Sequence, residues 1–355
     1  MSDERLARLY ASMRRRRLDA YLSVCPSNIR YLTGFTGEDS ALLVTGGGAF
    51  LLTDGRFDIQ ARNEVRGTEV VITNRKYKEA ARRLRLARSR RIGYESHCLS
   101  MESFHKCSAG REERWVSGSD LVEPLRMRKE LREILAIEAA SVAAAASLMS
   151  VISSGLNGKT ERDVAADLER EMKRRGAEEP SFPTIVAYGA RSAMPHAIPT
   201  WNRIGTEGPL IIDFGAKKGG YCSDETVTVF PGNPQRSLRK VRDAVRRAQD
   251  VGISSIGPGV ACKMVDARVR ESLDRSGYLK YFVHSTGHGV GLDVHERPTL
   301  SPRSKDLIEE GMVVTVEPGV YLPGIGGVRL EDTVKVTGSG CERVTFLPKA
   351  ETLLT

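Results

Sequence analysis

The stretch Phe282-Val-His-Ser-Thr-Gly-His-Gly-Val-Gly-Leu-Asp-Val-His-Glu-Arg-Pro298 is the feature around which this chain is organised. Of the six histidines in the sequence, three (His284, His288 and His295) lie in this run, with glycines interleaved between them. That much glycine disfavours a helix, so we predict a loop or irregular strand whose backbone can approach other segments closely. Imidazole binds divalent metal ions and transfers protons near neutral pH. The run therefore predicts a chemical site; the alternative is a glycine-rich turn with incidental histidines.

The length, hydrophobic content and net charge limit which class of protein this chain can be. A length of 355 residues suits two domains, and a hydrophobic content of 40% is enough for buried cores. The formal net charge of +9 comes mostly from arginine, with dense runs at 14–17 and 82–91. The second run alternates with Leu and Ala at helical spacing, which favours a solvated helix face over a nucleic-acid site. Aromatic residues are not interleaved with the basic ones, so we expect no nucleic-acid partner.

The cysteines and the N-terminus indicate the compartment. The six cysteines form no C-x-x-C pair, which predicts neither a zinc knuckle nor a disulfide scaffold. The charged N-terminus lacks the apolar segment of a secretory signal, and no uninterrupted apolar run approaches the length of a membrane span. We therefore expect a reduced, cytoplasmic protein that does not enter a membrane.

Residues 1–125 are predicted to form an α/β unit. A helix is expected over 6–18, and short strands at 20–24, 41–45, 49–53, 69–73 and 91–94. The second and third of these strands flank glycines and are predicted to form a hairpin. His97 and His105 lie near acidic residues, but no strand or helix pattern gathers them. We expect no chemical motif in this half.

Residues 126–355 are predicted to repeat a pattern of two helices followed by strands. The helices are expected at 130–152, 160–175, 236–256 and 262–275. Thr160 and Asp163 match a capping box at the start of the second helix. The strands after each helix pair carry acidic or imidazole side chains, which indicates two related αα-β halves.

The first of these halves carries two aspartates in a predicted hairpin. Asp213 lies in the apolar strand 210–216, and Asp224 lies in the return strand 221–230. A two-residue turn at Lys218-Gly219 would place Asp213 directly opposite Asp224, on one face of the sheet. Two half-buried carboxylates in that arrangement destabilise a fold unless a cation neutralises them. The alternative is a carboxylate bonded to Ser or Thr on a neighbouring strand.

The second half repeats this arrangement with two glutamates. Centring the turn on Gly324 places Glu317 opposite Glu331, with Arg329 on the same face. The two hairpins and one imidazole from the glycine-rich run supply five oxygen or nitrogen ligands. Such a set predicts a site for two divalent ions bridged by carboxylates and water. It favours manganese, cobalt or zinc, and we do not count the soft thiolate of Cys222 as a ligand.

These five residues resemble the ligand set of a known family, the pita-bread metallopeptidases, which includes methionine aminopeptidase, aminopeptidase P and prolidase. Residues 1–125 resemble the creatinase-type N-terminal domain of the last two enzymes, so the resemblance covers essentially the whole chain. It implies a mixed sheet with flanking helices in the first domain. In the second domain, 126–355, it implies an α+β pita-bread fold with pseudo-twofold αα-β halves around a curved antiparallel sheet. The matching ligands are Asp213, Asp224, His288, Glu317 and Glu331.

The resemblance also implies a role for each ligand. Asp213 and Asp224 would hold one metal ion, with Asp224 bridging to the second. His288 and Glu317 would hold the second ion, and Glu331 would also bridge. Glu317 would in addition carry a proton from water to the departing nitrogen.

Four further residues receive roles on the same basis. His196 would line the substrate side of the site, and His284 would lie near the proline pocket. His295 would contact the scissile amide, and Arg329 would lie beside the last ligand.

The implied activity is metal-dependent hydrolysis of the N-terminal Xaa-Pro bond by a hydroxide shared between two ions, with manganese expected and cobalt or zinc as alternatives. We expect an Xaa-Pro aminopeptidase acting on short peptides with proline at the second position. The close alternative is an Xaa-Pro dipeptidase (prolidase), and a remote one is a non-catalytic pita-bread binding protein. The resemblance also implies a homodimer.

Overall fold

The computed structural model describes residues 2–118, 120–233 and 235–347. Its chain divides into two compact units, Met1–Arg126 and Met127–Thr355, and each is described by itself. Residues 348–355 of the predicted second domain lie outside the described residues.

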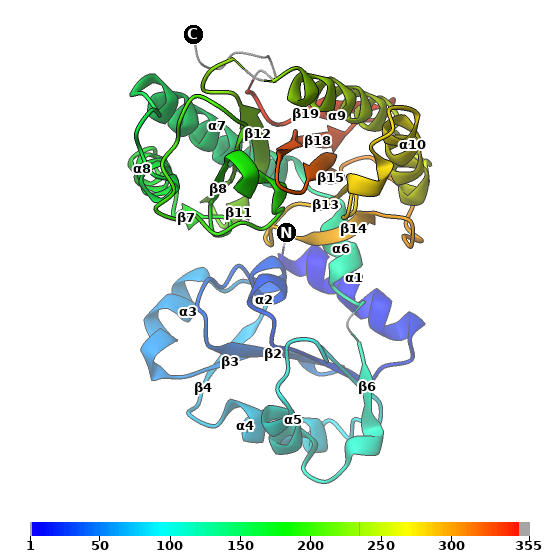
Figure 1. Cartoon of the computed structure of the whole chain (residues 1–355). Coiled ribbons are helices and arrows are strands. Elements are labelled where there is room, and N and C mark those ends of the chain that lie inside the picture. The colour runs from blue at the N-terminus through cyan, green and yellow to red at the C-terminus, as the bar shows by residue number, and fades with distance from the viewer. Residues whose placement is uncertain (1, 119, 234, 348–355) are drawn as a thin grey trace. The chain divides into compact units, whose positions relative to one another are not determined.

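The N-terminal unit is built on a six-stranded sheet with the order β4-β3-β2-β1-β5-β6 (Figure 1). Strand β1 pairs antiparallel with β2 but parallel with β5, so the sheet is mixed, as expected. The predicted hairpin is the antiparallel pair β2–β3. The elements are α1 (Ser2–Arg15), β1 (Ala20–Ser23), α2 (Pro26–Thr33), β2 (Ser40–Thr45), β3 (Gly48–Thr53), η1 (Gly55–Phe57), α3 (Asp58–Glu64), β4 (Glu69–Ile72), α4 (Lys76–Leu86), β5 (Ile92–Tyr94), α5 (Met101–Ser108), η2 (Glu112–Arg114), β6 (Trp115–Ser117) and α6 (Glu123–Met127).

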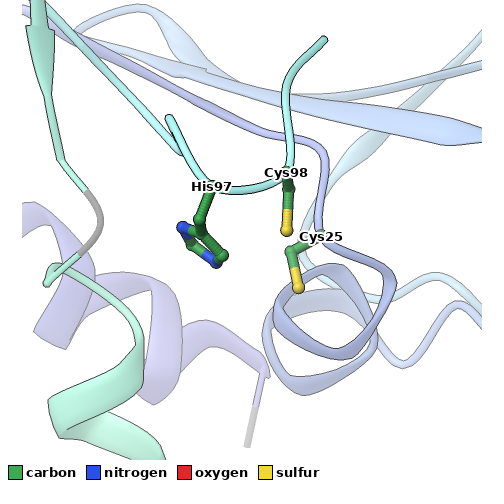
Figure 2. Close-up of side chains that lie close together, drawn as sticks. All are labelled: Cys25, His97 and Cys98. Carbon is green, nitrogen blue, oxygen red and sulfur yellow. The ribbon is translucent and has the colours of Figure 1, made fainter.

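One cluster in this unit was not foreseen. The parallel pairing of β1 with β5 brings the chain after each strand to the same edge of the sheet. Cys25 follows β1, and His97 and Cys98 follow β5, so the three side chains lie together (Figure 2). The sequence could not predict this cluster, because the three residues come together only once β1 and β5 become neighbours in the sheet.

The C-terminal unit contains two helix pairs, each followed by antiparallel strands (Figure 1). Helices α7 and α8 precede the sheet β12-β9-β8, and α9 and α10 precede the sheet β14-β13-β15-β18-β19. The repeated αα-β pattern is therefore confirmed. The elements are α7 (Leu131–Ser153), α8 (Glu161–Arg174), β7 (Glu179–Pro180), β8 (Ile185–Tyr188), η3 (Gly189–Ala193), β9 (Leu210–Phe214), β10 (Ala216–Lys218), β11 (Tyr221–Cys222), β12 (Glu225–Val229), α9 (Arg236–Ser254), α10 (Cys262–Arg275), η4 (Leu279–Tyr281), β13 (Gly287–Gly289), β14 (Glu296–Leu300), β15 (Val313–Val316), β16 (Gly319–Leu322), β17 (Gly326–Arg329), β18 (Asp332–Val336) and β19 (Cys341–Arg343).

By length and composition, helix α7 is long and apolar enough to cross a membrane, whereas the sequence predicts no membrane-spanning segment. Half of its most apolar window is buried within the protein. Ala144, Leu148 and Val151 on this helix belong to the hydrophobic core that also contains Phe214. Such burial is what a core helix of a folded domain requires.

Helix α8 begins as predicted. The Thr160 hydroxyl accepts a hydrogen bond from the Asp163 backbone N–H, and the Asp163 carboxylate accepts one from the Thr160 N–H at 2.8 Å. This capping box fixes the start of a helix whose first residue, Glu161, is fully buried.

The register of the aspartate hairpin differs from the prediction. Asp213 pairs with Thr226 rather than Asp224, because the turn residues are Gly219-Gly220 and not Lys218-Gly219. Both glycines adopt positive φ angles, 58° and 79°, which glycine accepts more readily than lysine. The shift is two residues, an even number, so Asp224 keeps the face predicted for it.

The register of the glutamate hairpin is as predicted. Gly319 pairs with Arg329 and Val316 pairs with Asp332, which is the pairing centred on Gly324. Glu317 and Glu331 lie where the ladder β16–β17 ends and β15–β18 begins. There the Glu317 N–H donates to Thr286 O, and the Glu331 N–H donates to Thr226 O at 3.1 Å.

Candidate metal centre

The glycine-rich run forms an irregular strand, as the sequence predicts. Strand β13 pairs with β14 on one side and β15 on the other, and its register shifts between His288 and Gly289. A Cβ atom on Gly287 would collide with the carbonyl of Thr315, and one on Gly289 with the carbonyl of Arg297. Glycine therefore lets the backbone of β13 lie close enough to its neighbours to present His288 to the acidic strands.

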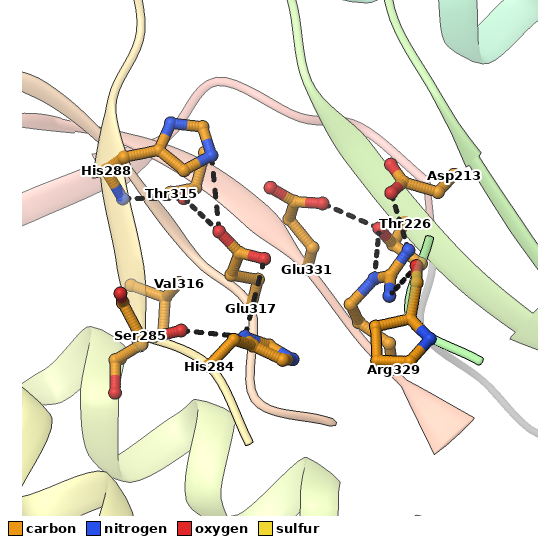
Figure 3. Close-up of polar contacts among 12 residues, drawn as sticks. Asp213, Thr226, His284, Ser285, His288, Thr315, Val316, Glu317, Arg329 and Glu331 are labelled. Atoms are coloured by element: carbon orange, nitrogen blue, oxygen red, sulfur yellow. Dashed lines mark hydrogen bonds and ion pairs between the residues drawn. The ribbon is translucent and has the colours of Figure 1, made fainter. Parts of the chain in front are cut away.

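Four of the five predicted ligands, Asp224, His288, Glu317 and Glu331, lie together at one centre, and the fifth, Asp213, is connected to it through Arg329 and Thr226. A nitrogen of His288 and carboxylate oxygens of Asp224 and Glu331 all lie within 4.8 Å of one another. His288 Nε2 is 3.6 Å from Asp224 Oδ2 and 3.2 Å from Glu317 Oε1. Figure 3 shows Glu317, His288 and Glu331 facing a common space, with Asp213 on the far side of Thr226.

Asp213 is held by the predicted arginine. The Arg329 Nη2 group donates to Asp213 Oδ2 at 2.5 Å, and the Arg329 side chain is buried. The same guanidinium donates from Nε to the Thr226 hydroxyl at 3.2 Å, and that hydroxyl donates to Glu331 Oε2 at 2.6 Å. Arg329 thus links a carboxylate of the first hairpin to one of the second (Figure 3).

Burial and crowding make two of the carboxyl groups hard to ionise in the absence of a cation. Desolvation raises the pKa of Asp224 well above its ordinary value, and the charges of Glu331, Asp213 and Glu317 add to the effect. Desolvation likewise raises the pKa of Glu331, with the charges of Glu317 and Asp213 next in importance. Such groups favour any cation that binds between them.

His288 and Glu317 partly neutralise each other. Burial alone would lower the pKa of His288, but its hydrogen bond to the Glu317 carboxylate and the charge of that group raise it. Burial raises the pKa of Glu317, while the hydrogen bond and charge of His288 outweigh it, so the net shift is downward. A metal cation bound between these groups would interact with the same Glu317 carboxylate.

Two oxygens in the centre are left for a cation. Asp213 Oδ1 and Glu331 Oε1 are buried and have no hydrogen-bonding partner among the described residues. A buried carboxylate oxygen without a partner costs about 1–3 kcal/mol, and more if charged. Oxygens of this kind, one from each hairpin, fit the hard-ligand set of a divalent metal ion.

Cys222 takes no part in this set, as predicted. Its thiol contacts the Leu292 carbonyl at 3.8 Å within an apolar cluster that includes Ile137 and Val290. Burial raises the pKa of this thiol to about 12, so it stays protonated.

Two of the three remaining predicted histidines, His284 and His295, contact the centre. The His295 ring lies 4.2 Å from the His288 ring, measured between centroids. His284 Nδ1 is 4.0 Å from Glu317 Oε2. Desolvation is the main cause that lowers the pKa of both His284 and His295, and the charge of the exposed His196 contributes to each. Neutral imidazoles therefore face the centre at neutral pH.

Three contributing residues were not predicted. Tyr321 accepts from Arg329 Nη1 and lies 2.8 Å from His284 Nε2, which connects the arginine to that imidazole. Thr315 donates to Glu317 Oε1 and accepts from the His288 N–H. Thr226 bridges Arg329 and Glu331. A weak signal existed for Thr226 and Thr315, because each lies two residues from a predicted ligand on the same strand face.

The fold and the centre together define a metal-dependent hydrolase, and comparison with known proteins identifies its family. Residues 129–338 match the model of metallopeptidase family M24, and residues 5–128 match the creatinase/prolidase N-terminal domain. The chain therefore belongs to metallopeptidase family M24, and membership implies divalent metal ions.

Similar proteins align over nearly the whole chain. An Xaa-Pro dipeptidase of Pyrococcus furiosus is 35% identical, covering 96% of this chain and 97% of that protein. The solved structure of an Xaa-Pro dipeptidase from Bacillus anthracis is 36% identical with a TM-score of 0.95, covering 99% of both chains. The structure of an X-Pro aminopeptidase from Thermotoga maritima is 33% identical with a TM-score of 0.87, covering 96% of this chain and 99% of that one.

Proposed function

We propose that this protein is an Xaa-Pro dipeptidase, a prolidase, which hydrolyses the bond between the first residue and proline in a dipeptide. The sequence by itself favours an Xaa-Pro aminopeptidase and leaves the dipeptidase as the alternative. The support comes from relatives named as Xaa-Pro dipeptidases that align over nearly the full length of the chain. The aminopeptidase remains the second candidate, because an X-Pro aminopeptidase structure also aligns.

The observation that supports hydrolysis is that Asp224, His288, Glu317 and Glu331 lie together, with Asp213 joined to them through Arg329. We propose two divalent ions, manganese by preference. Asp213 and Asp224 would hold one ion, and His288 and Glu317 the other, with Asp224 and Glu331 reaching both. When bound, such ions supply Lewis acidity and lower the pKa of a water molecule.

The protein's own groups would then handle charge and protons. Glu317 lies within contact of both His288 and His284, so its carboxylate can take up a proton and return it to the proline nitrogen. His295 is neutral at neutral pH because burial lowers its pKa, and a neutral imidazole N–H can donate to an oxyanion without adding a charge. Arg329 donates to the Asp213 carboxylate and thereby orients it.

A three-peptide panel tests the proposal. The peptides are Xaa-Pro, Xaa-Pro-Yaa and the amidated Xaa-Pro-NH₂, each assayed with manganese, cobalt and zinc added to the chelator-stripped protein. A dipeptidase must recognise the free carboxylate next to proline, so the first peptide should be cleaved and the other two resisted. A kcat/KM for Xaa-Pro-Yaa that equals or exceeds that for Xaa-Pro would establish the aminopeptidase instead. An Asp224→Asn variant serves as the control for hydrolysis by a contaminating enzyme.

We also propose that the protein acts as a homodimer. The support is the family resemblance alone, and sedimentation equilibrium over a range of protein concentrations tests it.

A further inference from the structure

We propose that Cys25, His97 and Cys98 in the N-terminal unit form a second metal site, separate from the hydrolytic centre, that binds a zinc ion. The two sulfur atoms and one imidazole nitrogen all lie within 4.8 Å of one another. Figure 2 shows the two thiols and the imidazole on adjoining loops. In a tetrahedral zinc site, neighbouring sulfur and nitrogen ligands lie roughly 3.4–3.8 Å apart, so small side-chain rotations suffice to close the set around an ion.

The loops that carry these ligands are held together by one buried residue, Glu95, through its side chain and its backbone. Glu95 Oε2 accepts hydrogen bonds from the N–H groups of Val24 and Cys25, both at 2.7 Å. The backbone carbonyl of Glu95 accepts from the Cys98 N–H at 3.2 Å. A single residue thus ties the Cys25 loop to the Cys98 loop. This arrangement orders the ligands before an ion arrives, which lowers the entropy that binding must overcome.

A fourth side chain, Glu123, lies beside the Cys25, His97 and Cys98 cluster. Glu123 Oε1 lies 3.6 Å from His97 Nε2, and Asn28 Nδ2 donates to it at 3.0 Å. The other oxygen, Glu123 Oε2, is buried and has no hydrogen-bonding partner among the described residues. Metal-binding histidines ordinarily have a carboxylate partner, and zinc also accepts a carboxylate as its fourth ligand. In either arrangement Glu123 would have a binding role, whereas its Oε2 has no hydrogen-bonding partner among the described residues.

The ligand chemistry selects the metal. Thiolate and imidazole together suit zinc, whereas the hydrolytic centre offers four carboxylates and one imidazole. His97 and Cys98 are exposed and Cys25 is half-buried, so an ion can reach the site from solvent. The nearby carboxylates of Glu95 and Glu123 make the surroundings favourable for a cation. Burial, aided by the charges of Cys25, Glu95 and Glu123, raises the pKa of the Cys98 thiol, which disfavours a redox thiol pair at this position.

The test counts metal in the full chain with the hydrolytic centre disabled. An Asp224→Asn/Glu331→Gln variant, kept reduced, is stripped with a chelator, dialysed against zinc and analysed by mass spectrometry. One zinc per chain is expected, and the further change Cys98→Ser should remove it. Cys341→Ser, which alters a half-buried cysteine elsewhere, should retain it. Zinc content that is unchanged by Cys98→Ser would overturn the proposal, as would zinc absent from the disabled variant.

Cobalt gives a second, spectroscopic readout that reports the ligand type directly. Cobalt bound by thiolates shows an intense charge-transfer absorption in the near ultraviolet, and the carboxylate-rich centre cannot produce it. Titration of the wild-type chain with cobalt should yield this band, and titration of Cys25→Ser or Cys98→Ser should not. A band that disappears only in Cys222→Ser would place the thiolate at the hydrolytic centre and refute the assignment.

Discussion

The buried Arg329 guanidinium and the Asp213 carboxylate form an ion pair, with Nη2 and Oδ2 2.5 Å apart. Asp213 belongs to the first hairpin of the C-terminal unit and Arg329 to the second, so the pair joins the two halves at the metal centre. Arg329 also donates to the Tyr321 hydroxyl, the Pro195 carbonyl and the Thr226 hydroxyl. One planar side chain therefore fixes a proposed ligand and the loop that leads to His196.

Replacing this arginine by lysine should be damaging although the charge is kept. An ammonium group cannot reproduce the directions of the guanidinium donors, so Asp213 would lose its orientation. We expect Arg329→Lys to weaken metal binding or kcat/KM by about 10–100-fold, as for other residues that orient metal ligands. Manganese titration of activity and of metal content measures both effects. Tyr321→Phe, which removes only one of the contacts, should lose less; equal losses would show that Arg329 acts mainly through Tyr321.

Replacing Glu331 by glutamine should change stability in opposite directions with and without metal. Glutamine avoids the cost of burying an ionisable carboxyl beside Glu317 and Asp213, so the melting temperature of the metal-free chain should rise at neutral pH. The amide oxygen can still accept from Thr226. With metal present, the wild type gains about 2.7 kcal/mol at a hundredfold excess over Kd, and Glu331→Gln should gain much less. Thermal melting with chelator and with manganese separates the two states. A variant stabilised by manganese as strongly as the wild type would show that Glu331 is not a ligand.

Metal binding should strengthen as the pH rises. The raised pKa values of Asp224 and Glu331 mean that the metal-free chain holds protons which the metal must displace. A carboxyl group with a raised folded pKa stabilises the metal-free fold at low pH, and this stability is lost as the pH rises through the raised value. The metal-free protein should thus lose stability upward from about pH 4, while the metal-bound protein should not. Melting curves at several pH values, with and without manganese, check this; a difference that shrinks with pH contradicts it.

The loop that carries His196 depends on Glu161. This fully buried carboxylate accepts hydrogen bonds from the Tyr188 N–H, the Arg191 guanidinium and both the N–H and hydroxyl of Thr200. Glu161→Gln would leave some donors without an acceptor and loosen the loop. We expect KM for Xaa-Pro to rise several-fold with metal content unchanged.

The control for that prediction lies on the same helix. Glu171 on α8 forms an ion pair with Arg174 and does not support the His196 loop, so Glu171→Gln should leave KM unchanged. If Glu161→Gln lowers metal content and leaves KM alone, the loop does not position substrate as proposed.

Much of the metal centre could be predicted from local pattern. The alternation of side chains along strands identifies which face Asp213, Asp224, Glu317 and Glu331 share, and the glycine spacing identifies an irregular strand around His288. The register of the glutamate hairpin followed from its turn. The register of the aspartate hairpin did not, because the choice among Lys218, Gly219 and Gly220 depends on which residues can adopt positive φ in the folded turn.

The sequence by itself predicted the carboxylate candidates and the strands that carry them, because both depend on residue identity and short-range periodicity, and the resemblance to a known family singled out His288. Only the tertiary structure decided which distant segments meet. The hydrogen-bonded path through Thr226, Tyr321 and Arg329 arises from contact between separate hairpins. The cluster of Cys25 with His97 and Cys98 arises from the parallel pairing of β1 with β5. The physical reason is that strand pairing across 70 residues is set by the packing of the whole sheet, and no short stretch of sequence contains that information.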